Sequence, residues 1–349
     1  MAVGNLEPEP YREERHVGPG YGASLSRLDE DDVRVRPGRS SRPRTRTRPR
    51  HQDAVPGFVI AVDRGRFTCR VDGRDITAMR ARELGRRSVV VGDRVAVVGE
   101  LGGGPDALAR IVRVTDRTSA LRRTADDTDP VERVVVANAD TLVVVTALVD
   151  PPPRTGLVDR CLVAAYDAGL DPVLCLTKSD LGSPESLLAT YRPLGVAAVV
   201  VGRTDAGAGV EALRERLTGR LSVLIGHSGV GKSTLVNALV PAAERATGTV
   251  NPVTGRGRHT SSSAVALQLD EDGWVIDTPG LRSFGLAHVS ADRVVAAFTD
   301  LAPGTENCPQ GCSHLIPRCA LDEWVAAGRA TPGRLRSLRH LLANRVVEP

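Results

Sequence analysis

One octapeptide limits the folds open to this chain more than any other feature of its sequence. Gly226-His227-Ser228-Gly229-Val230-Gly231-Lys232-Ser233 follows an apolar run and opens a helical pattern, which is the context of a phosphate-binding loop. Its glycines let backbone N–H groups curl around phosphate oxygens, and the helix N-terminus adds a favourable field. We expect Lys232 to reach the β and γ oxygens and Ser233 to bind Mg²⁺, with Thr234 beside them at the nucleotide. A chance glycine-rich turn is the alternative.

The residues around this loop have the pattern of a parallel sheet. After Asp140, continuous apolar runs alternate with amphipathic stretches, as expected when helices cover both faces of the sheet. The sequence therefore predicts an α/β nucleotide-binding domain over residues 130–289. The predicted strands are Leu142–Thr146, Pro172–Leu176, Ala197–Val201, Ser222–Ile225, Val265–Leu269 and Trp274–Ile276.

A tetrapeptide at the end of another predicted strand indicates which base is bound. Thr177-Lys178-Ser179-Asp180 stands where ligands bind in open α/β sheets. Asp180 can accept hydrogen bonds from the N1–H and the exocyclic amine of guanine, and adenine would leave this carboxylate unpaired. Lys178 would pack its stem over the base. Lysine occurs only at Lys178 and Lys232, although lysine and arginine together number 46, which favours a nucleotide role over a solvated turn.

A third segment matches the magnesium side of such a site. Asp277-Thr278-Pro279-Gly280 follows a predicted strand, and we expect Asp277 in the outer shell of the metal and the Gly280 amide on the γ-phosphate. Thr260, within the glycine- and arginine-rich segment 255–261, is the candidate for a second Mg²⁺ hydroxyl. A surface loop is the alternative for that segment.

The residue that orients the attacking water is less obvious. Leu281 occupies the position after Gly280 where many GTPases place glutamine. His259 directly precedes Thr260 and is therefore the candidate to position the water. The alternative is that His259 contacts RNA or loop backbone and that another molecule completes the site.

The order of the three segments makes the set specific. Ordinary GTPases have the phosphate loop first, whereas here the guanine segment precedes it, which is a circular permutation. In this order the chain resembles the family of the circularly permuted ribosome small-subunit-dependent GTPase A (RsgA), over about residues 55–345. The resemblance includes Val91-Gly92-Asp93-Arg94-Val95 and Gly257-Arg258-His259-Thr260. It implies binding to the 30S subunit and its 16S rRNA in late maturation, with GTP hydrolysis stimulated by the ribosome.

The residues before the GTPase domain divide into two parts. Residues 1–52 lack apolar periodicity and hold eight arginines between Val33 and Arg50, which predicts a disordered basic tail. Residues 53–120 alternate β-rich runs with turns and predict a β-barrel of the oligonucleotide-binding (OB) type that contacts RNA. Four arginines offer phosphate contacts, although a solvated basic face is the alternative: Arg80, Arg82, Arg86 and Arg87.

The end of the chain carries a metal-ligand pattern. Cys308-x₃-Cys312-x-His314-x₄-Cys319 supplies three thiolates and an imidazole, a full tetrahedral set for one structural Zn²⁺. We expect a zinc-binding helical module over residues 290–349, with a basic amphipathic helix from Pro332 to Val346. Free cysteines beside a surface histidine are the alternative.

These expectations describe a GTPase that is cytoplasmic, because no apolar run is long enough for a membrane span. We also expect it to be a monomer. Its partners would be GTP or GDP with Mg²⁺, and the 30S subunit. The alternative function is a nucleotide-sensing placeholder on ribosomal RNA with negligible hydrolysis, which Leu281 leaves open. An ATP-dependent kinase is disfavoured by Asp180.

Overall fold

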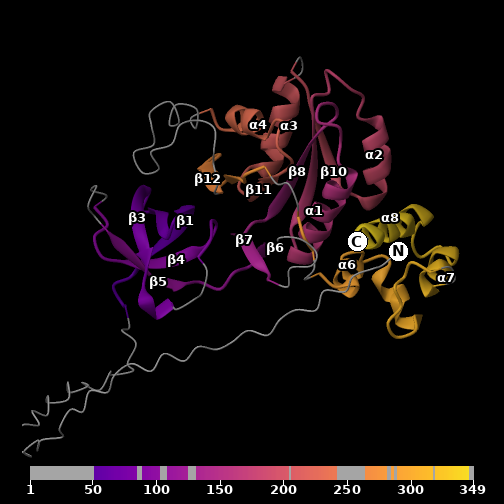
Figure 1. The fold of residues 1–349 in the computed structure, drawn as a ribbon, viewed down its shortest axis with the longest axis horizontal. Coiled ribbons are helices and arrows are strands. Elements are labelled where there is room, and N and C mark those ends of the chain that lie inside the picture. Colours follow the sequence, from indigo (N-terminus) through magenta and orange to yellow (C-terminus); the bar gives the residue numbers. More distant parts are fainter. Residues whose placement is uncertain are drawn as a thin grey trace, which may run out of the picture. The chain divides into compact units, whose positions relative to one another are not determined.

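The computed structural model describes nine segments of the chain (Figure 1). They are residues 51–84, 89–102, 108–124, 131–203, 206–241, 264–280, 284–286, 289–316 and 319–345, and all of them belong to the compact unit Pro49–Pro349. The predicted basic tail lies outside these segments except for its last two residues. Among the described residues, no helix is both long and apolar enough to cross a membrane.

Five short strands form a closed barrel in the first part of the unit (Figure 1). Their order is β1-β2-β3-β5-β4, and the pairing of β1 with β4 closes the barrel. Inward and outward side chains alternate, so that Phe67 and Cys69 are buried and Arg66 is exposed. The predicted OB-type barrel is confirmed. Its strands are β1 (Val55–Asp63), β2 (Arg66–Val71), β3 (Arg74–Arg80), β4 (Arg94–Val98) and β5 (Ala109–Val114).

The sequence predicts four β-rich runs in the barrel, and β3 is not among them: Gly57–Val62, Arg66–Val71, Asp93–Val98 and Ala109–Val114. The exposed ends of β3, such as Arg74 and Arg80, hide the alternation of buried Ile76 and Ala78. The sequence nevertheless contains a local signal for this hairpin, the pair Asp72-Gly73. Both residues have positive φ, 46° and 75°. An Asp-Gly pair in this conformation is typical of a two-residue hairpin turn.

The second part is a sheet with helices on both faces. Strands β8 (Thr141–Ala147), β9 (Asp171–Thr177), β10 (Ala197–Val201), β11 (Leu221–Ile225) and β13 (Trp274–Asp277) are parallel, in the order β10-β9-β8-β11-β13. Leu142 and Val144 pack on the side of α1 (Thr155–Ala168) and α2 (Glu185–Tyr191), whereas Val143 and Val145 pack on the side of α3 (Ala206–Leu217) and α4 (Lys232–Leu239). The predicted α/β fold is confirmed.

One strand differs from the expectation. β12 (Val265–Gln268) was predicted as part of the parallel sheet, but it runs antiparallel to β13. The connection between them, residues 269–273, is too short for the crossover that a parallel neighbour requires. β12 also pairs with β1 through Val265 and Ala61, so the sheet continues into the barrel.

A small hairpin and a buried polar junction connect the barrel to the GTPase sheet. β6 (Ala120–Arg123) pairs with β7 (Arg133–Ala137), and the Ala137 N–H donates to the Val91 carbonyl at 3.0 Å. Asn138 Nδ2 donates to the Gly92 carbonyl at 2.8 Å, and its Oδ1 accepts from the Thr118 N–H at 2.9 Å. The motif around Gly92 therefore holds the two parts together.

The described C-terminal residues form a helical module, and the segment with Cys308, Cys312 and His314 lies between two of its helices. It comprises α6 (Ala291–Ala296), the 3₁₀ turn η4 (Ala302–Asn307), α7 (Ala320–Ala326) and α8 (Pro332–Arg345). Helix α8 packs on α1, and His340 Nε2 lies 2.8 Å from the buried carboxylate of Asp159. The observed α8 agrees with the predicted helix up to Arg345, and Val346 lies outside the described residues.

The barrel junction makes a stability prediction. Gly92 has a φ of 91°, and a Cβ added there would lie 2.0 Å from the Ala137 carbonyl oxygen. Gly65 has a φ of 85°, but a Cβ added there would meet no atom within 4 Å apart from its chain neighbours. Gly65→Ala should therefore cost about 1 kcal/mol through φ strain alone, and Gly92→Ala about 3 kcal/mol or more. Urea unfolding of both variants measures the difference, and equal losses would contradict this description of the junction.

Candidate functional site

The phosphate loop lies between the end of β11 and the start of α4. Gly229 and Gly231 have φ values of 84° and 92°, which glycine adopts without strain. A Cβ on Gly226 would lie 2.3 Å from the Val145 carbonyl oxygen, so only glycine fits where the loop leaves the sheet. Ser233 and Thr234 are exposed at the start of α4, where a helix N-terminus favours an anion.

Lys232 is held inside the loop. Its side chain is buried, and Nζ donates to the Gly226 carbonyl at 3.1 Å. Burial lowers the pKa of Lys232 from its ordinary value, and the negative charge of Asp277 opposes this shift. His227 stays at the loop surface, with Nδ1 2.9 Å from the Ser228 carbonyl oxygen. The ammonium is therefore directed to the loop interior.

The segment Asp277–Gly280 lies directly against this loop. β13 is parallel to β11 with Asp277 opposite Leu224, and Thr278 Oγ1 donates to the Leu224 carbonyl at 2.7 Å. A Cβ on Gly280 would lie 3.1 Å from the backbone of Ser228, so the two segments pack closely.

The carboxylate of Asp277 fits a place beside a metal ion. Burial raises the pKa of Asp277, and the positive charge of Lys232 opposes the shift. Its Oδ1 is buried without a hydrogen-bond partner among the described residues. A buried acceptor of this kind costs free energy until a donor reaches it, and a water molecule on a bound Mg²⁺ is such a donor.

The guanine segment follows β9 at the same edge of the sheet. The Lys178 ammonium donates to the Asp150 carbonyl, and the Thr177 hydroxyl donates to the Val230 carbonyl of the phosphate loop at 2.6 Å. Asp180 faces a cleft of about 530 Å³. The cleft is lined by Thr177, Lys178, Asp180, Leu181, Val201, Gly202, Arg203, Val210, Gly231, Thr234, Leu235 and Ala238.

The structure adds a segment to which sequence reasoning assigned no role. The Arg203 N–H donates to Asp180 Oδ1 at 3.0 Å, and a Cβ on Gly202 would lie 2.4 Å from Ser179 Oγ. The signal that could have found it is positional. Gly202 follows β10, the strand next to β9, and ligand-binding loops gather at this edge of a parallel sheet.

Some of the expected site residues are not described. Thr260, His259 and the rest of segment 255–261 lie outside the described residues, as does Leu281.

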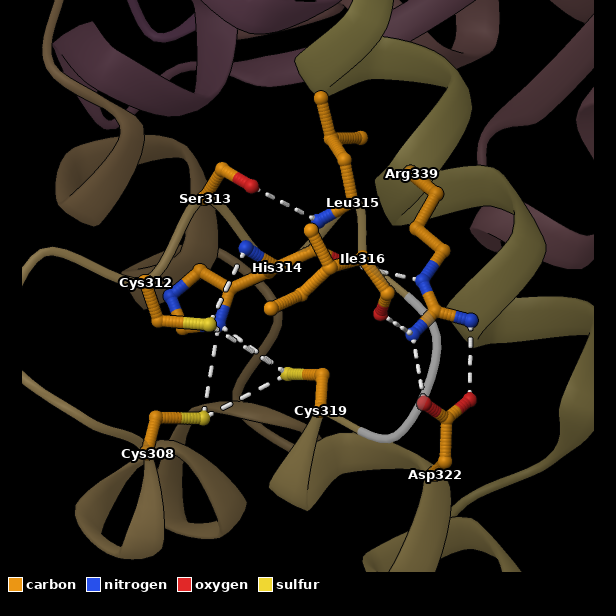
Figure 2. A network of polar contacts seen from close by, with 9 residues as sticks. All are labelled: Cys308, Cys312, Ser313, His314, Leu315, Ile316, Cys319, Asp322 and Arg339. Atoms are coloured by element: carbon orange, nitrogen blue, oxygen red, sulfur yellow. Dashed lines mark hydrogen bonds and ion pairs between the residues drawn. The ribbon is translucent and has the colours of Figure 1, made fainter.

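Four candidate metal ligands converge in the C-terminal module (Figure 2). The Cys319 sulfur lies 3.5 Å from that of Cys308 and 3.8 Å from that of Cys312, and His314 Nδ1 lies 3.6 Å from Cys308 and 3.5 Å from Cys319. Tetrahedral Zn²⁺ with ordinary bond lengths would separate two sulfurs by about 3.8 Å and sulfur from nitrogen by about 3.6 Å. The observed distances therefore fit a metal of this size.

The surroundings of the cluster also suit a cation. Burial raises the pKa of the Cys319 thiol to about 12, and a bound cation would oppose this shift by stabilising the thiolate. Burial lowers the pKa of His314, which favours the neutral imidazole that binds metals. Figure 2 shows Arg339 reaching across to the loop, where Nε donates to the His314 carbonyl at 2.9 Å and the guanidinium pairs with Asp322.

The fold and the converging segments define a class of protein, the circularly permuted P-loop GTPases. Residues 114–287 match the family described as RsgA GTPase. The small ribosomal subunit biogenesis GTPase RsgA of Pseudomonas aeruginosa (strain LESB58) is 38% identical over 265 residues, which cover 74% of this chain and 76% of that protein. The protein of the same name from Chlorobaculum parvum is 38% identical over 278 residues, 77% of this chain and 89% of its own.

Solved structures agree with this class. YjeQ from Thermotoga maritima has a TM-score of 0.60 and 26% identity, covering 84% of this chain and 98% of its own. YloQ, a circularly permuted GTPase, has a TM-score of 0.59 at 22% identity, covers 86% of this chain and 98% of its own, and supports the fold alone. The chain belongs to the RsgA GTPase family.

Proposed function

We propose that this chain hydrolyses GTP to GDP and phosphate and acts on the small ribosomal subunit during its biogenesis. The observation that carries the proposal is the meeting of Thr177–Asp180, Gly226–Ser233 and Asp277–Gly280 at one edge of the parallel sheet. The relatives named as small ribosomal subunit biogenesis GTPases support the substrate and the partner.

In the proposed mechanism, the phosphates lie along the loop N–H groups and the N-terminus of α4. Lys232 places its ammonium at the β and γ oxygens, and the Gly280 N–H donates to the γ-phosphate. The Ser233 and Thr260 hydroxyls would bind Mg²⁺, and Asp277 would accept a hydrogen bond from a water of its shell. The ion, when bound, neutralises charge that develops on the phosphate oxygens.

Base choice is assigned to Asp180. Its carboxylate would accept from N1–H and the exocyclic amine of guanine, while Lys178 covers one face of the base. Gly202 supports this arrangement because it leaves room for Ser179 and lets the Arg203 N–H hold one carboxylate oxygen. That oxygen would then be oriented before the nucleotide arrives.

Contact with 16S rRNA is assigned mainly to the charge of the barrel. Arg80 and Arg82 are exposed, whereas Arg86 and Arg87 lie outside the described residues. The barrel's two phenylalanines, Phe58 and Phe67, are half-buried and buried, so phosphate contacts are favoured over base stacking.

We further propose a cytoplasmic monomer. A placeholder that binds GTP with negligible hydrolysis is the second candidate, favoured by Leu281 at the usual glutamine position.

The assignment of Asp180 is tested by a change of base. Asp180→Asn should weaken GTP binding by roughly a hundredfold and shift preference toward xanthosine triphosphate, because the xanthine edge offers an acceptor to the amide. Equilibrium binding of both nucleotides to the two proteins measures the shift. Unchanged selectivity for GTP would rule out this role for Asp180.

We also propose that the cluster Cys308, Cys312, His314 and Cys319 holds one structural Zn²⁺ required for docking to the 30S subunit. Cys312→Ser should lower bound zinc by at least about tenfold and weaken 30S binding, with nucleotide affinity retained. Zinc analysis of purified protein and sedimentation with 30S subunits are the measurements. Cys175→Ala is the control, because it removes a thiol outside the cluster. Wild-type protein without stoichiometric zinc would contradict the proposal.

The catalytic role of His259 rests on the sequence alone, since Leu281 leaves the water without its usual partner. His259→Ala should reduce 30S-stimulated turnover by roughly a hundredfold, while GTP affinity and 30S binding stay near normal. Turnover that falls only in proportion to lost 30S binding would make His259 a docking residue.

A further inference from the structure

The side chain of Thr177 connects the base-reading segment to the phosphate loop. Thr177 is the last residue of β9, is 6% exposed, and lines the cleft that Asp180 faces. Its hydroxyl donates to the Val230 carbonyl at 2.6 Å, and the Thr146 carbonyl is more distant at 3.4 Å. Gly231 lies against the same side chain, because a Cβ there would be 3.8 Å from Thr177 Oγ1.

The Val230 carbonyl needs this donor. Val230 is 3% exposed and lies between Gly229 and Gly231, both at positive φ. A phosphate loop presents N–H groups to its anion, so a carbonyl facing the sheet must be satisfied from the sheet side. If Thr177 turned away, a buried acceptor would lose its partner, at a cost at least as large as one new neutral hydrogen bond returns.

A threonine hydroxyl has a single proton to donate. Guanine presents N1–H and its exocyclic amine at one edge, and the acceptor N7 at the opposite edge. A hydroxyl whose proton is held by Val230 offers N7 only a lone pair, and two acceptors do not bond. The hydrogen bond to the Val230 carbonyl therefore prevents Thr177 from donating a hydrogen bond to N7 of the base.

We propose that Thr177 is a positioning residue that ties the guanine segment to the phosphate loop and takes no part in recognition of guanine N7. The inference rests on the proposed binding of guanine nucleotides at this site. Thr177 then contributes to the affinity for every guanine nucleotide alike, and base choice is left to Asp180. Arg203 and Thr234 also line the cleft, so the test must isolate the pair formed by Thr177 and N7.

The experiment is a cycle of two proteins and two ligands. Binding of GDP and of 7-deaza-GDP, which has C–H in place of N7, is measured by calorimetry on the full chain and on Thr177→Val. The variant keeps the shape of the side chain and removes the hydroxyl. It should weaken both ligands by about the same factor, roughly tenfold, because the Val230 carbonyl loses its donor. Thr177→Ser keeps the hydroxyl and should bind both ligands within about threefold of the unchanged chain.

The ratio of the two dissociation constants decides the outcome. We expect this ratio to differ less than about twofold between the unchanged chain and Thr177→Val, whatever its absolute value. A ratio of fivefold or more in the unchanged chain that falls toward one in Thr177→Val would mean that the hydroxyl reads N7, and would overturn the inference. Unweakened binding by Thr177→Val would overturn the positioning role.

Two further readouts separate other causes. Thermal unfolding without nucleotide identifies a variant that has lost its fold, in which case Thr177→Ser and the unchanged chain still report whether the hydroxyl supports binding and whether N7 matters. Failure of the unchanged chain to bind either guanine nucleotide would overturn the proposed function itself. Binding with a hydroxyl-dependent response to N7 would overturn this inference alone.

Discussion

The close packing of the phosphate loop on the end of β8 is the constraint on which the site depends. Gly226 leaves no room for a Cβ beside the Val145 carbonyl, and Lys232 folds back onto the Gly226 carbonyl. This contact fixes where the N-terminus of α4 points. The Asp277 segment and the guanine segment are then placed by strand pairing on either side, since β13 pairs with β11 and β9 pairs with β8.

This arrangement explains why the permuted order leaves the site intact. The segments are loops at one edge of a parallel sheet, and their positions follow from strand neighbours and not from the order of the strands along the chain. The permutation places the barrel before β8 and the C-terminal helical module after β13. The barrel reaches the sheet through Asn138, one residue after β7, and through the pairing of β1 with β12, whereas the module packs through α8 on the helix α1. None of these contacts uses the phosphate loop or the guanine segment.

Much of the site could be predicted from residues that are close in the sequence, whereas the contacts between distant residues could not. The phosphate loop and the cluster Cys308–Cys319 could be predicted because their residues are close in sequence and their spacing is specific. The link between Thr177 and Val230 joins residues 53 positions apart, and that between Asn138 and Gly92 joins residues 46 apart. Neither leaves a periodic signal. Gly202 was missed for the same reason, since its role depends on the pairing of β10 with β9.

The most direct test of the account is phosphate release from GTP and from ATP by the full chain, measured with and without small ribosomal subunits. We expect slow release from GTP alone, strong stimulation by the subunits, and no comparable release from ATP. Stimulation is expected because a site with Leu281 in place of glutamine depends on an added partner to order the water. Tight GTP binding without stimulated release would support the placeholder function instead, and equal release from ATP would contradict the assignment of Asp180.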